Sequence, residues 1–308
     1  MSGVYGILGG DRRQIYLARS IAADGYPVCI SCLGHEKGAD GLEQSSLEQP
    51  SLEPPSPLPP SPEQLSLEQV PPEELLRRSD LIILPLPVTR DGKTLNTPLS
   101  AYTVALDDGF AAECAGKAVY GGMMEKLLQT SPLWGGISTY DYYAREELMV
   151  GNAFLTAEGA LGVAIQEYEG AINGAHCLVT GFGRIGKALC MGLKGLGAKV
   201  DCCARKSEDL TAIRAIGCAP LKYEEIHGAY DVIFNTVPAR VLTAQILSRQ
   251  RPDTLLIELA SQPGGMDLEA AQRLKLRVKN APSIPGRMSP RAAGELIKET
   301  IYNMISGL

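Results

Sequence analysis

The sequence Cys177-Leu178-Val179-Thr180-Gly181-Phe182-Gly183-Arg184-Ile185-Gly186 joins an apolar run to glycines spaced as G-x-G-x-x-G. The apolar run is typical of a buried strand, and the helical apolar spacing that follows predicts a helix over Ile185–Leu196. In such a strand–turn–helix, the first glycine makes the tight turn, the second lets the backbone approach a pyrophosphate, and the third lets helix and strand pack closely. Exposed N–H groups and the helix dipole attract the phosphates. We therefore predict a dinucleotide site formed by Gly181, Phe182, Gly183, Arg184, Ile185 and Gly186; the alternative is a glycine-rich turn without a ligand.

The residues after the next strand distinguish NAD from NADP. An acidic residue about 20 positions after the motif would bind the ribose 2′-hydroxyl of NAD. This chain has Ala204-Arg205-Lys206-Ser207 there instead. Two cations and a hydroxyl suit a 2′-phosphate, and an arginine also stacks on adenine. We predict NADP, bound by Arg205, Lys206 and Ser207; the alternative is that the two cations are solvated loop residues.

Two further strand ends are expected to border the same ligand. Asn235-Thr236-Val237-Pro238 follows a strand predicted over Asp231–Asn235, and Leu259-Ala260-Ser261-Gln262-Pro263-Gly264-Gly265 ends a strand over Leu255–Leu259. Ligands of doubly wound sheets lie beyond the carboxyl ends of the strands. Thr236, Val237 and Pro238 are therefore placed near the nicotinamide ribose, and Ser261 on the nicotinamide side.

Alternating strands and helices predict an α/β protein with two doubly wound parallel-sheet domains, and 308 residues suit two domains at about 150 residues each. We expect an N-terminal substrate domain of flavodoxin-like type from residues 1–150 plus 289–308, and a Rossmann domain from residues 151–288. The N-terminal elements expected are strands Gly3–Leu8, Val28–Leu33 and Asp80–Leu86, helices Gln14–Asp24, Pro72–Arg78, Tyr140–Leu148 and Thr156–Glu169, and α/β elements over Leu99–Leu106 and Lys117–Tyr120. Those expected later are strands Cys177–Thr180, Lys199–Ala204, Asp231–Asn235, Leu255–Leu259 and Arg277–Asn280, and helices Ile185–Leu196, Ser207–Ile216, Ala239–Leu247, Leu268–Leu274 and Pro290–Ile305.

Residues 36–72 interrupt this pattern. They are rich in Pro, Ser, Glu, Gln and Leu, contain no aromatic residue, and repeat Ser-Leu-Glu-Gln at 46–49 and 66–69. Such a composition cannot bury enough apolar area to offset the entropy of ordering. We interpret the segment as a disordered, partly polyproline insertion in a surface loop.

Composition excludes several classes of protein. The net charge of −6 comes from the acidic residues of 36–72, and the remainder is formally neutral, so we expect no nucleic-acid partner. No apolar run approaches the ~18 residues of a membrane span, and no secretory signal precedes the first strand, so we expect a cytoplasmic protein without membrane contact. The eight cysteines lie mostly in apolar runs, as buried reduced thiols do. His35, His176 and His227 are poorly placed for zinc or Ser-His-Asp chemistry, and we expect no metal.

Several short motifs together resemble a known family. Outside residues 36–72, the chain is similar over nearly its whole length to the A subunits of dipicolinate synthase, an enzyme of spore-forming bacteria. The matching stretches are Gly9-Gly10-Asp11-Arg12-Arg13, residues 80–87, Asn152 with residues 156–160, Gly181–Gly186, residues 235–238, residues 259–265 and Ile284-Pro285-Gly286-Arg287-Met288-Ser289-Pro290. The resemblance implies an NADP-dependent oxidoreductase that converts a dihydrodipicolinate-type or 4-hydroxy-tetrahydrodipicolinate compound, from a branch of the lysine pathway, to pyridine-2,6-dicarboxylate. It also implies a B-subunit-like flavoprotein partner, an oligomer, and a place in the mother cell of a sporulating bacterium.

A dicarboxylate substrate needs cationic or N–H partners. Arg12, Arg13, Arg90, Lys93 and Arg287 are our candidates because they flank turns expected at the substrate site; Arg12 and Arg13 also begin a helix after a glycine turn. Loss of water from a hydroxylated substrate would need a general acid or base. Asp91 and Glu158 are the candidates, with Asp11 as a further carboxylate. Surface ion pairs are the alternative for each cation.

Two other functions remain open at this point. The first is a non-catalytic nucleotide-binding or scaffold subunit whose flavoprotein partner performs the redox step, since no obvious catalytic base is present. The second is a shikimate-dehydrogenase-like or alanine-dehydrogenase-like reductase, which shares the sheet plan and the Asn-Thr-x-Pro turn. Lys93 and Asp91 would then imitate the Lys/Asp pair of shikimate chemistry.

Overall fold

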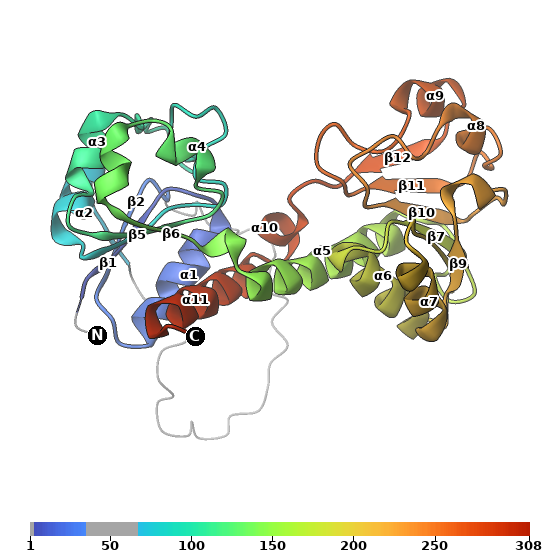
Figure 1. Ribbon diagram of the computed structural model, residues 1–308, viewed down its shortest axis with the longest axis horizontal. Helices are drawn as coiled ribbons and strands as arrows, with labels where there is room; N and C mark the ends of the chain where they lie inside the picture. The colour runs from blue at the N-terminus through green and yellow to red at the C-terminus, as the bar shows by residue number, and fades with distance from the viewer. Residues whose placement is uncertain (1–2, 35–66) are drawn as a thin grey trace, which may run out of the picture. The chain divides into compact units, whose positions relative to one another are not determined.

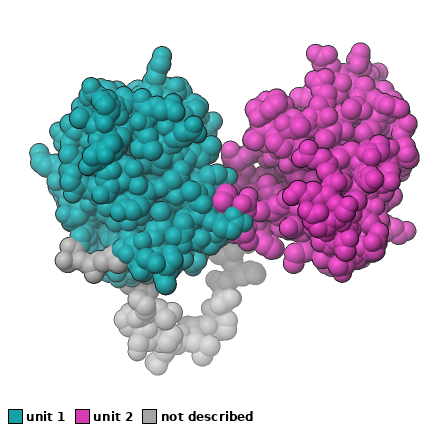
Figure 2. Space-filling model, in the orientation of Figure 1, with its two compact units in different colours: residues 1–148, 290–308 teal, residues 149–289 magenta. Residues whose placement is uncertain are grey.

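The computed structural model describes residues 3–34 and 67–308, and the chain divides into two compact units (Figures 1 and 2). Unit 1 comprises Met1–Leu148 and Pro290–Leu308, and unit 2 comprises Met149–Ser289. Residues 35–66, which include His35 and most of the proline-rich segment, lie outside the described residues. The last helix therefore belongs to the same unit as the first strand.

Unit 1 is built on a parallel sheet in the order β3-β2-β1-β4-β5-β6. Its strands are β1 (Tyr5–Leu8), β2 (Val28–Ser31), β3 (Glu68–Gln69), β4 (Leu81–Ile83), β5 (Ala118–Gly121) and β6 (Ser138–Asp141). Its helices are α1 (Arg12–Ala23), α2 (Pro72–Arg78), α3 (Asp108–Glu113), α4 (Glu125–Leu128) and α11 (Pro290–Ser306), with 3₁₀ turns at Pro132–Gly136 and Tyr142–Ala144. Strand side chains alternate between two apolar layers, one covered by α1 and α11 and the other by α2, α3 and α4.

Unit 2 repeats this plan with a parallel sheet in the order β12-β11-β10-β7-β8-β9. Its strands are β7 (His176–Thr180), β8 (Lys199–Cys203), β9 (Ala219–Leu221), β10 (Val232–Asn235), β11 (Leu255–Glu258) and β12 (Arg277–Asn280). Its helices are α6 (Arg184–Gly195), α7 (Ser207–Ala215), α8 (Ala244–Leu247), α9 (Leu268–Arg273) and α10 (Ile284–Met288), with a 3₁₀ turn at Tyr223–Glu225; α5 (Glu146–Glu167) begins in unit 1 and continues here. Helices α5, α6 and α7 cover one face of the sheet, and α8 and α9 cover the other.

The prediction of two doubly wound parallel sheets is confirmed. Both sheets have the 3-2-1-4-5-6 order of the Rossmann fold when their strands are numbered along the chain. In unit 1 this order depends on the two-residue β3, because without it the sheet would have the 2-1-3-4-5 order of flavodoxin. The strand order of each sheet reverses at β1/β4 and at β7/β10, and these are the places where a doubly wound sheet binds ligands.

Three expectations about individual elements were wrong, and two strands were missed. The helix expected over Tyr140–Leu148 is strand β6, a 3₁₀ turn and the first turn of α5, which runs without a break to Glu167. The helix expected over Ala239–Leu247 is only Ala244–Leu247. The element expected over Leu99–Leu106 is irregular, with a single bridge from Ala105 to Thr94. Strands β3 and β9 were not expected.

The end of the proline-rich segment is also ordered, contrary to the interpretation of 36–72 as disordered throughout. Glu68 and Gln69 pair with Cys29 and Ile30 of β2, Val70 is buried, and α2 begins at Pro72. The Arg78 guanidinium holds both Glu68 carboxylate oxygens at 2.7 Å. Pairing with the sheet thus orders a sequence that has little strand propensity of its own.

Helix α5 is long and apolar, which bears on the expectation that the chain has no apolar run as long as a membrane span. Among residues 3–34 and 67–308, it is the one helix long and apolar enough to cross a membrane by length and composition alone. Asn152 and Glu158 interrupt it, so it is apolar on average without containing an unbroken apolar run of the length we looked for. Ala157, Ala160 and Ala164 of α5 lie in the core of unit 2, whereas Val150, Phe154 and Ile165 of the same helix are exposed.

The cysteine prediction is confirmed, since all eight thiols are buried and free. Burial raises the pKa of the Cys114 and Cys177 thiols to about 12. Thiols with such pKa values carry little thiolate at neutral pH and are poor nucleophiles.

Candidate functional site

The glycine turn of unit 2 has the backbone that the sequence motif predicts. Gly181 follows β7 with φ +92°, a region that residues other than glycine rarely adopt. A Cβ on Gly186 would overlap the carbonyl oxygen of Gly181, so the third glycine lets α6 pack against the turn. Gly183 is the N-cap residue of α6.

The N-terminus of α6 is open toward solvent. Gly183 has no side chain to cap the helix, and a Cβ placed on it would meet no atom within 4 Å. The first N–H groups of any helix have no partner within the helix, and here the N-cap supplies none. Unfilled space in front of uncapped amides and a positive helix end fits a pyrophosphate.

The other residues of the motif differ in their roles. Phe182 is 8% exposed and packs in the core, with the Lys187 ammonium 5.3 Å from its ring centroid. The Phe182 side chain therefore supports the turn, and only its backbone is placed to meet a ligand. Arg184 is exposed and Ile185 is half-buried in the first turn of α6.

The predicted 2′-phosphate residues follow β8. Arg205, Lys206 and Ser207 are exposed, and the Lys206 ammonium is 3.9 Å from the Glu208 carboxylate. The acidic residue of β8 itself, Asp201, is engaged elsewhere: it accepts a hydrogen bond from the Tyr230 hydroxyl and lies 3.1 Å from His176 Nε2. The described segment from Cys203 to Ser207 contains no acidic residue. It therefore lacks the carboxylate that binds the ribose hydroxyls in NAD sites.

A buried polar network joins the carboxyl ends of three strands beside this turn. The Thr180 hydroxyl donates to Asn235 Oδ1 at 2.5 Å, and Asn235 Nδ2 donates to Glu258 Oε1 at 2.6 Å. The Glu258 carboxylate also accepts the backbone N–H of Ala260 at 3.0 Å and of Gly265 at 3.1 Å. Sequence reasoning missed Thr180, Asn235 and Glu258 as a group, although each is a polar residue that ends an apolar strand.

This network sets the loops that carry the other predicted cofactor residues. The Thr236 hydroxyl donates to Thr180 O at 2.7 Å and lies where a Cβ on Gly181 would fall. Asn235 binds both the N–H and the C=O of Val237, and Pro238 beyond it is exposed. Ser261 is exposed in a turn closed by the Gly264 N–H, after the network has fixed the loop at Ala260.

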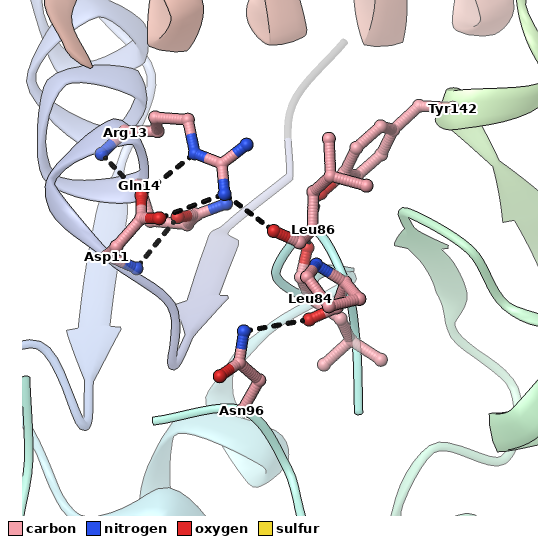
Figure 3. Close-up of polar contacts among 8 residues, drawn as sticks. Asp11, Arg13, Gln14, Leu84, Leu86, Asn96 and Tyr142 are labelled. Carbon is pink, nitrogen blue, oxygen red and sulfur yellow. Dashed lines mark hydrogen bonds and ion pairs between the residues drawn. The ribbon is translucent and has the colours of Figure 1, made fainter. Parts of the chain in front are cut away.

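The glycine turn of unit 1 differs from that of unit 2. Asp11 caps α1, accepting the Arg13 N–H, and it pairs with the Arg13 guanidinium at 2.9 Å (Figure 3). Arg13 Nη2 also donates to the Leu86 carbonyl at 2.6 Å, and the Gly10 N–H is bound to Asn96 O. A carboxylate of the protein thus lies at this helix start, and a substrate contact by Arg12 or Arg13 remains a prediction. Arg13 is 9% exposed and holds the loop after β4 in place.

Asp91 does not have the contacts of a general acid or base. It accepts the N–H groups of Lys93 and Thr94 and the hydroxyls of Thr89 and Thr94, all within 3.0 Å. The Thr94 and Lys93 N–H groups, followed by the Thr94 hydroxyl, hold the pKa of this carboxyl well below its usual range. These contacts fix the turn from Thr89 to Thr94, and the catalytic role expected of Asp91 remains a prediction.

The remaining predicted residues are not brought together within one unit. Arg12, Arg90 and Lys93 are exposed in unit 1, whereas Glu158 on α5 and Arg287 on α10 are exposed in unit 2. The Arg90 carbonyl accepts the Lys126 ammonium at 2.8 Å, which secures the loop that carries Arg90. Their roles toward a substrate remain predictions.

Comparisons with known proteins agree with this geometry. The family described as D-isomer specific 2-hydroxyacid dehydrogenase, NAD binding domain, matches residues 156–259, which include the glycine turn and end after β11. The chain is 26% identical over 310 residues to the A subunit of dipicolinate synthase from Bacillus subtilis (strain 168), covering 97% of this chain and 95% of that protein. The chain resembles this A subunit along nearly its whole length. This confirms the resemblance indicated by the sequence motifs.

Solved structures of dipicolinate synthase A subunits have the same fold. The A subunit from Bacillus halodurans matches with a TM-score of 0.80 at 24% identity, covering 99% of this chain and 98% of that one. The A subunit from Bacillus subtilis matches with a TM-score of 0.77 at 24% identity, covering 100% of this chain and 97% of that one. The dehydrogenase domain match and the dipicolinate synthase relative together support an oxidoreductase that uses a nicotinamide dinucleotide. The relative is named as one subunit of its enzyme, which implies a partner subunit for that protein.

Proposed function

We propose that this chain is an NADP-dependent oxidoreductase subunit that forms dipicolinate from a dihydrodipicolinate-type or 4-hydroxy-tetrahydrodipicolinate precursor. The observation that carries the proposal is the uncapped N-terminus of α6 beside a strand end that offers Arg205 and Lys206. The helix end suits a pyrophosphate, and the two cations suit the additional 2′-phosphate of NADP. The substrate class follows from the relative that matches 97% of the chain.

The cofactor supplies a hydride acceptor, and the chain's own residues would orient and shield the reaction. For a dihydropyridine, one ring carbon gives up a hydride and the ring loses a proton, which leaves the aromatic pyridine dicarboxylate and reduced cofactor. Aromatisation supplies much of the driving force, so the protein's main task is to position the ring and exclude water. The hydroxylated precursor also loses water, for which Glu158 remains our candidate acid or base.

The substrate carboxylates need exposed cations, and unit 1 offers Arg12, Arg90 and Lys93. Arg287 of unit 2 is a further candidate. Arg13 is proposed as a residue that positions the loop after β4, because its guanidinium is engaged by Asp11 and Leu86. We also propose that a B-subunit-like flavoprotein is the partner.

One observation favours a second candidate function. Asp91 is engaged in its own turn, which leaves unit 1 with one fewer carboxylate for proton transfer. A nucleotide-binding subunit that supports a catalytic partner would need none. In that case the glycine turn would still bind NADP, but the chain alone would turn over no substrate.

Nicotinamide fluorescence and turnover of the purified full chain test the proposal. We expect NADPH to bind with a clear preference over NADH, and NADP⁺ to be reduced when a dihydrodipicolinate-type substrate is added. Binding without turnover, restored by the flavoprotein partner, would favour the second function. A clear NADH preference would contradict the assignment of Arg205 and Lys206, and absence of any nucleotide binding would overturn both functions.

A further inference from the structure

Glu258 is a buried carboxylate at the carboxyl end of β11, on the nicotinamide half of the candidate site. It is 8% exposed, and its neighbours in the network, Thr180 and Asn235, are fully buried. Burying a carboxylate costs free energy unless hydrogen bonds replace its hydration, so Glu258 needs donors around it. Glu258 has them, since three N–H groups donate to it.

Each of the three hydrogen bonds to Glu258 is donated to it, which suits a carboxylate. Oε1 accepts from Asn235 Nδ2 and the Ala260 N–H, and Oε2 accepts from the Gly265 N–H. A protonated carboxyl would need an acceptor for its own O–H, whereas each of these partners is a donor. Among the residues that the structure describes, these partners are all uncharged amides, so the negative charge is stabilised by dipoles and is not neutralised by a cation.

The network also makes the site a single hydrogen-bonded unit. Glu258 fixes both ends of the loop from Ala260 to Gly265, and Asn235 fixes Val237 after β10. A Cβ on Gly265 would overlap the Val237 carbonyl and the Asn235 amide, so these two loops lie in direct contact. Loss of the carboxylate would therefore loosen the loops on which Thr236 and Ser261 are predicted to meet the ligand.

Sheet topology places the nicotinamide near this charge. A dinucleotide lies across the point where the strand order reverses, with one mononucleotide on each half of the sheet. The reversal is at β7/β10, and the predicted 2′-phosphate residues follow β8, so the nicotinamide half lies over β10 and β11. Oxidised nicotinamide is a cation and reduced nicotinamide is neutral, so a fixed negative charge distinguishes them.

We infer that Glu258 is a positioning residue whose buried ionised carboxylate favours the oxidised, cationic nicotinamide over the reduced one. The inference rests on the proposed use of a nicotinamide dinucleotide and goes beyond it, because it assigns the redox preference of the site to one side chain. Such a preference suits a subunit that removes hydride from its substrate. Even at about 15 Å with an effective dielectric of about 20, one charge changes such an equilibrium about sixfold.

Isothermal titration of the full chain with NADP⁺, NADPH, NAD⁺ and NADH tests the inference without any turnover. In the wild-type protein we expect the oxidised form of the preferred pair to bind more tightly. Glu258→Gln keeps the shape and removes the charge, so the ratio of oxidised to reduced affinity should fall about fivefold or more. Glu258→Asp retains the charge, and we expect it to weaken binding while keeping the ratio within about twofold.

Thr180→Val is the matched control, because it removes one hydrogen bond of the same network and no charge. We expect it to weaken both redox forms alike. Tighter binding of the reduced form by the wild-type protein would overturn the inference even if Glu258→Gln did not fold. An unchanged ratio in Glu258→Gln would also overturn it, while leaving the proposed function intact. Absence of binding by all four nucleotides would overturn the proposed function and this inference together.

Discussion

Units 1 and 2 share one sheet plan and differ in how their first helix begins. In each, a strand leads through glycines to a helix at the point where the strand order reverses. In unit 1 the N-cap is Asp11, whose carboxylate binds the helix start and Arg13. In unit 2 the N-cap is Gly183, which leaves the helix start open.

This difference shows that topology alone does not predict an anion site. A capping carboxylate satisfies the helix N–H groups and brings a negative charge to the place where a phosphate would sit. A capping glycine does neither. The N-cap residue is thus one feature that separates the two glycine turns, and the Gly10 N–H of unit 1, which is bound to Asn96 O, is a second.

The largest expected effect comes from the two glycines of unit 2 that surround the turn. Gly186→Ala places a methyl group against the Gly181 carbonyl, and we expect it to destabilise unit 2 by about 3 kcal/mol, as overpacking against backbone does. Gly183→Ala meets open space, so we expect the free energy of unfolding to fall by no more than about 1 kcal/mol, the cost of a poorer N-cap, while nucleotide affinity falls about tenfold. Denaturant unfolding and nucleotide titration of both variants check this contrast. Equal destabilisation of the two would contradict the assigned roles.

The next effect tests the self-capped turn of unit 1. Asp11→Ala removes a helix cap and leaves the buried Arg13 guanidinium without its carboxylate, so we expect a loss of about 2 kcal/mol in the stability of unit 1. Asp11→Asn keeps the cap and should cost less. Titration calorimetry should still show a single nucleotide site in both variants, because the Gly10 N–H remains bound to Asn96. A second site appearing in Asp11→Ala would show that the carboxylate alone excluded a ligand.

A smaller effect concerns cofactor choice in unit 2. Arg205→Ala should weaken NADPH binding about tenfold and change NADH binding less than about twofold, because only NADPH carries a 2′-phosphate. Lys206→Ala should have a smaller effect, since Glu208 already lies near its ammonium. Arg214→Ala is the control. Arg214 lies in the last turn of α7, the helix that begins directly after Lys206, and its loss should leave both affinities unchanged. Equal losses for NADPH and NADH in Arg205→Ala would refute a 2′-phosphate contact.

The smallest effect is a pH dependence in unit 1. The folded pKa of Asp91 lies below its unfolded value, so its stabilising contribution is present above the unfolded pKa and is lost as the pH falls through the folded one. Asp91→Ala should therefore lower the melting temperature at pH 7, and the difference from wild type should begin to shrink below about pH 4. Thermal melts across this range measure it. A difference that stays constant with pH would mean that the turn does not depend on the charge.

Local pattern predicted most strands and the alternation of helices between them. It failed where long-range pairing decides, as at β3, which forms because β2 offers an edge to Glu68 and Gln69. It also failed at α5, where Gly151, Gly159 and Gly162 obscure the helical pattern. The structure accommodates Gly159 because Ile284 packs where a Cβ would project, so tertiary contact compensates for a poor helix former.

At the candidate site, the glycine turn could be predicted because its chemistry lies in consecutive residues. The network of Thr180, Asn235 and Glu258 could not, since its members are far apart in sequence and meet only when three strands align. Arg13 is a different case. Its cationic side chain and its place after a glycine turn indicated an anion contact, and within unit 1 the structure shows one with the adjacent Asp11.

Helix α11 has a consequence for the order in which the two units are completed during synthesis. A Cβ on Gly294 would lie 2.5 Å from the Arg13 carbonyl, so α11 lies directly on α1 and covers one apolar face of unit 1. All of unit 2 is encoded between α1 and α11. On the ribosome, unit 2 can therefore acquire its full core first, while the apolar cluster around Ile15, Leu17 and Ile21 of unit 1 lacks Ile297 and Ile301 until the last helix emerges.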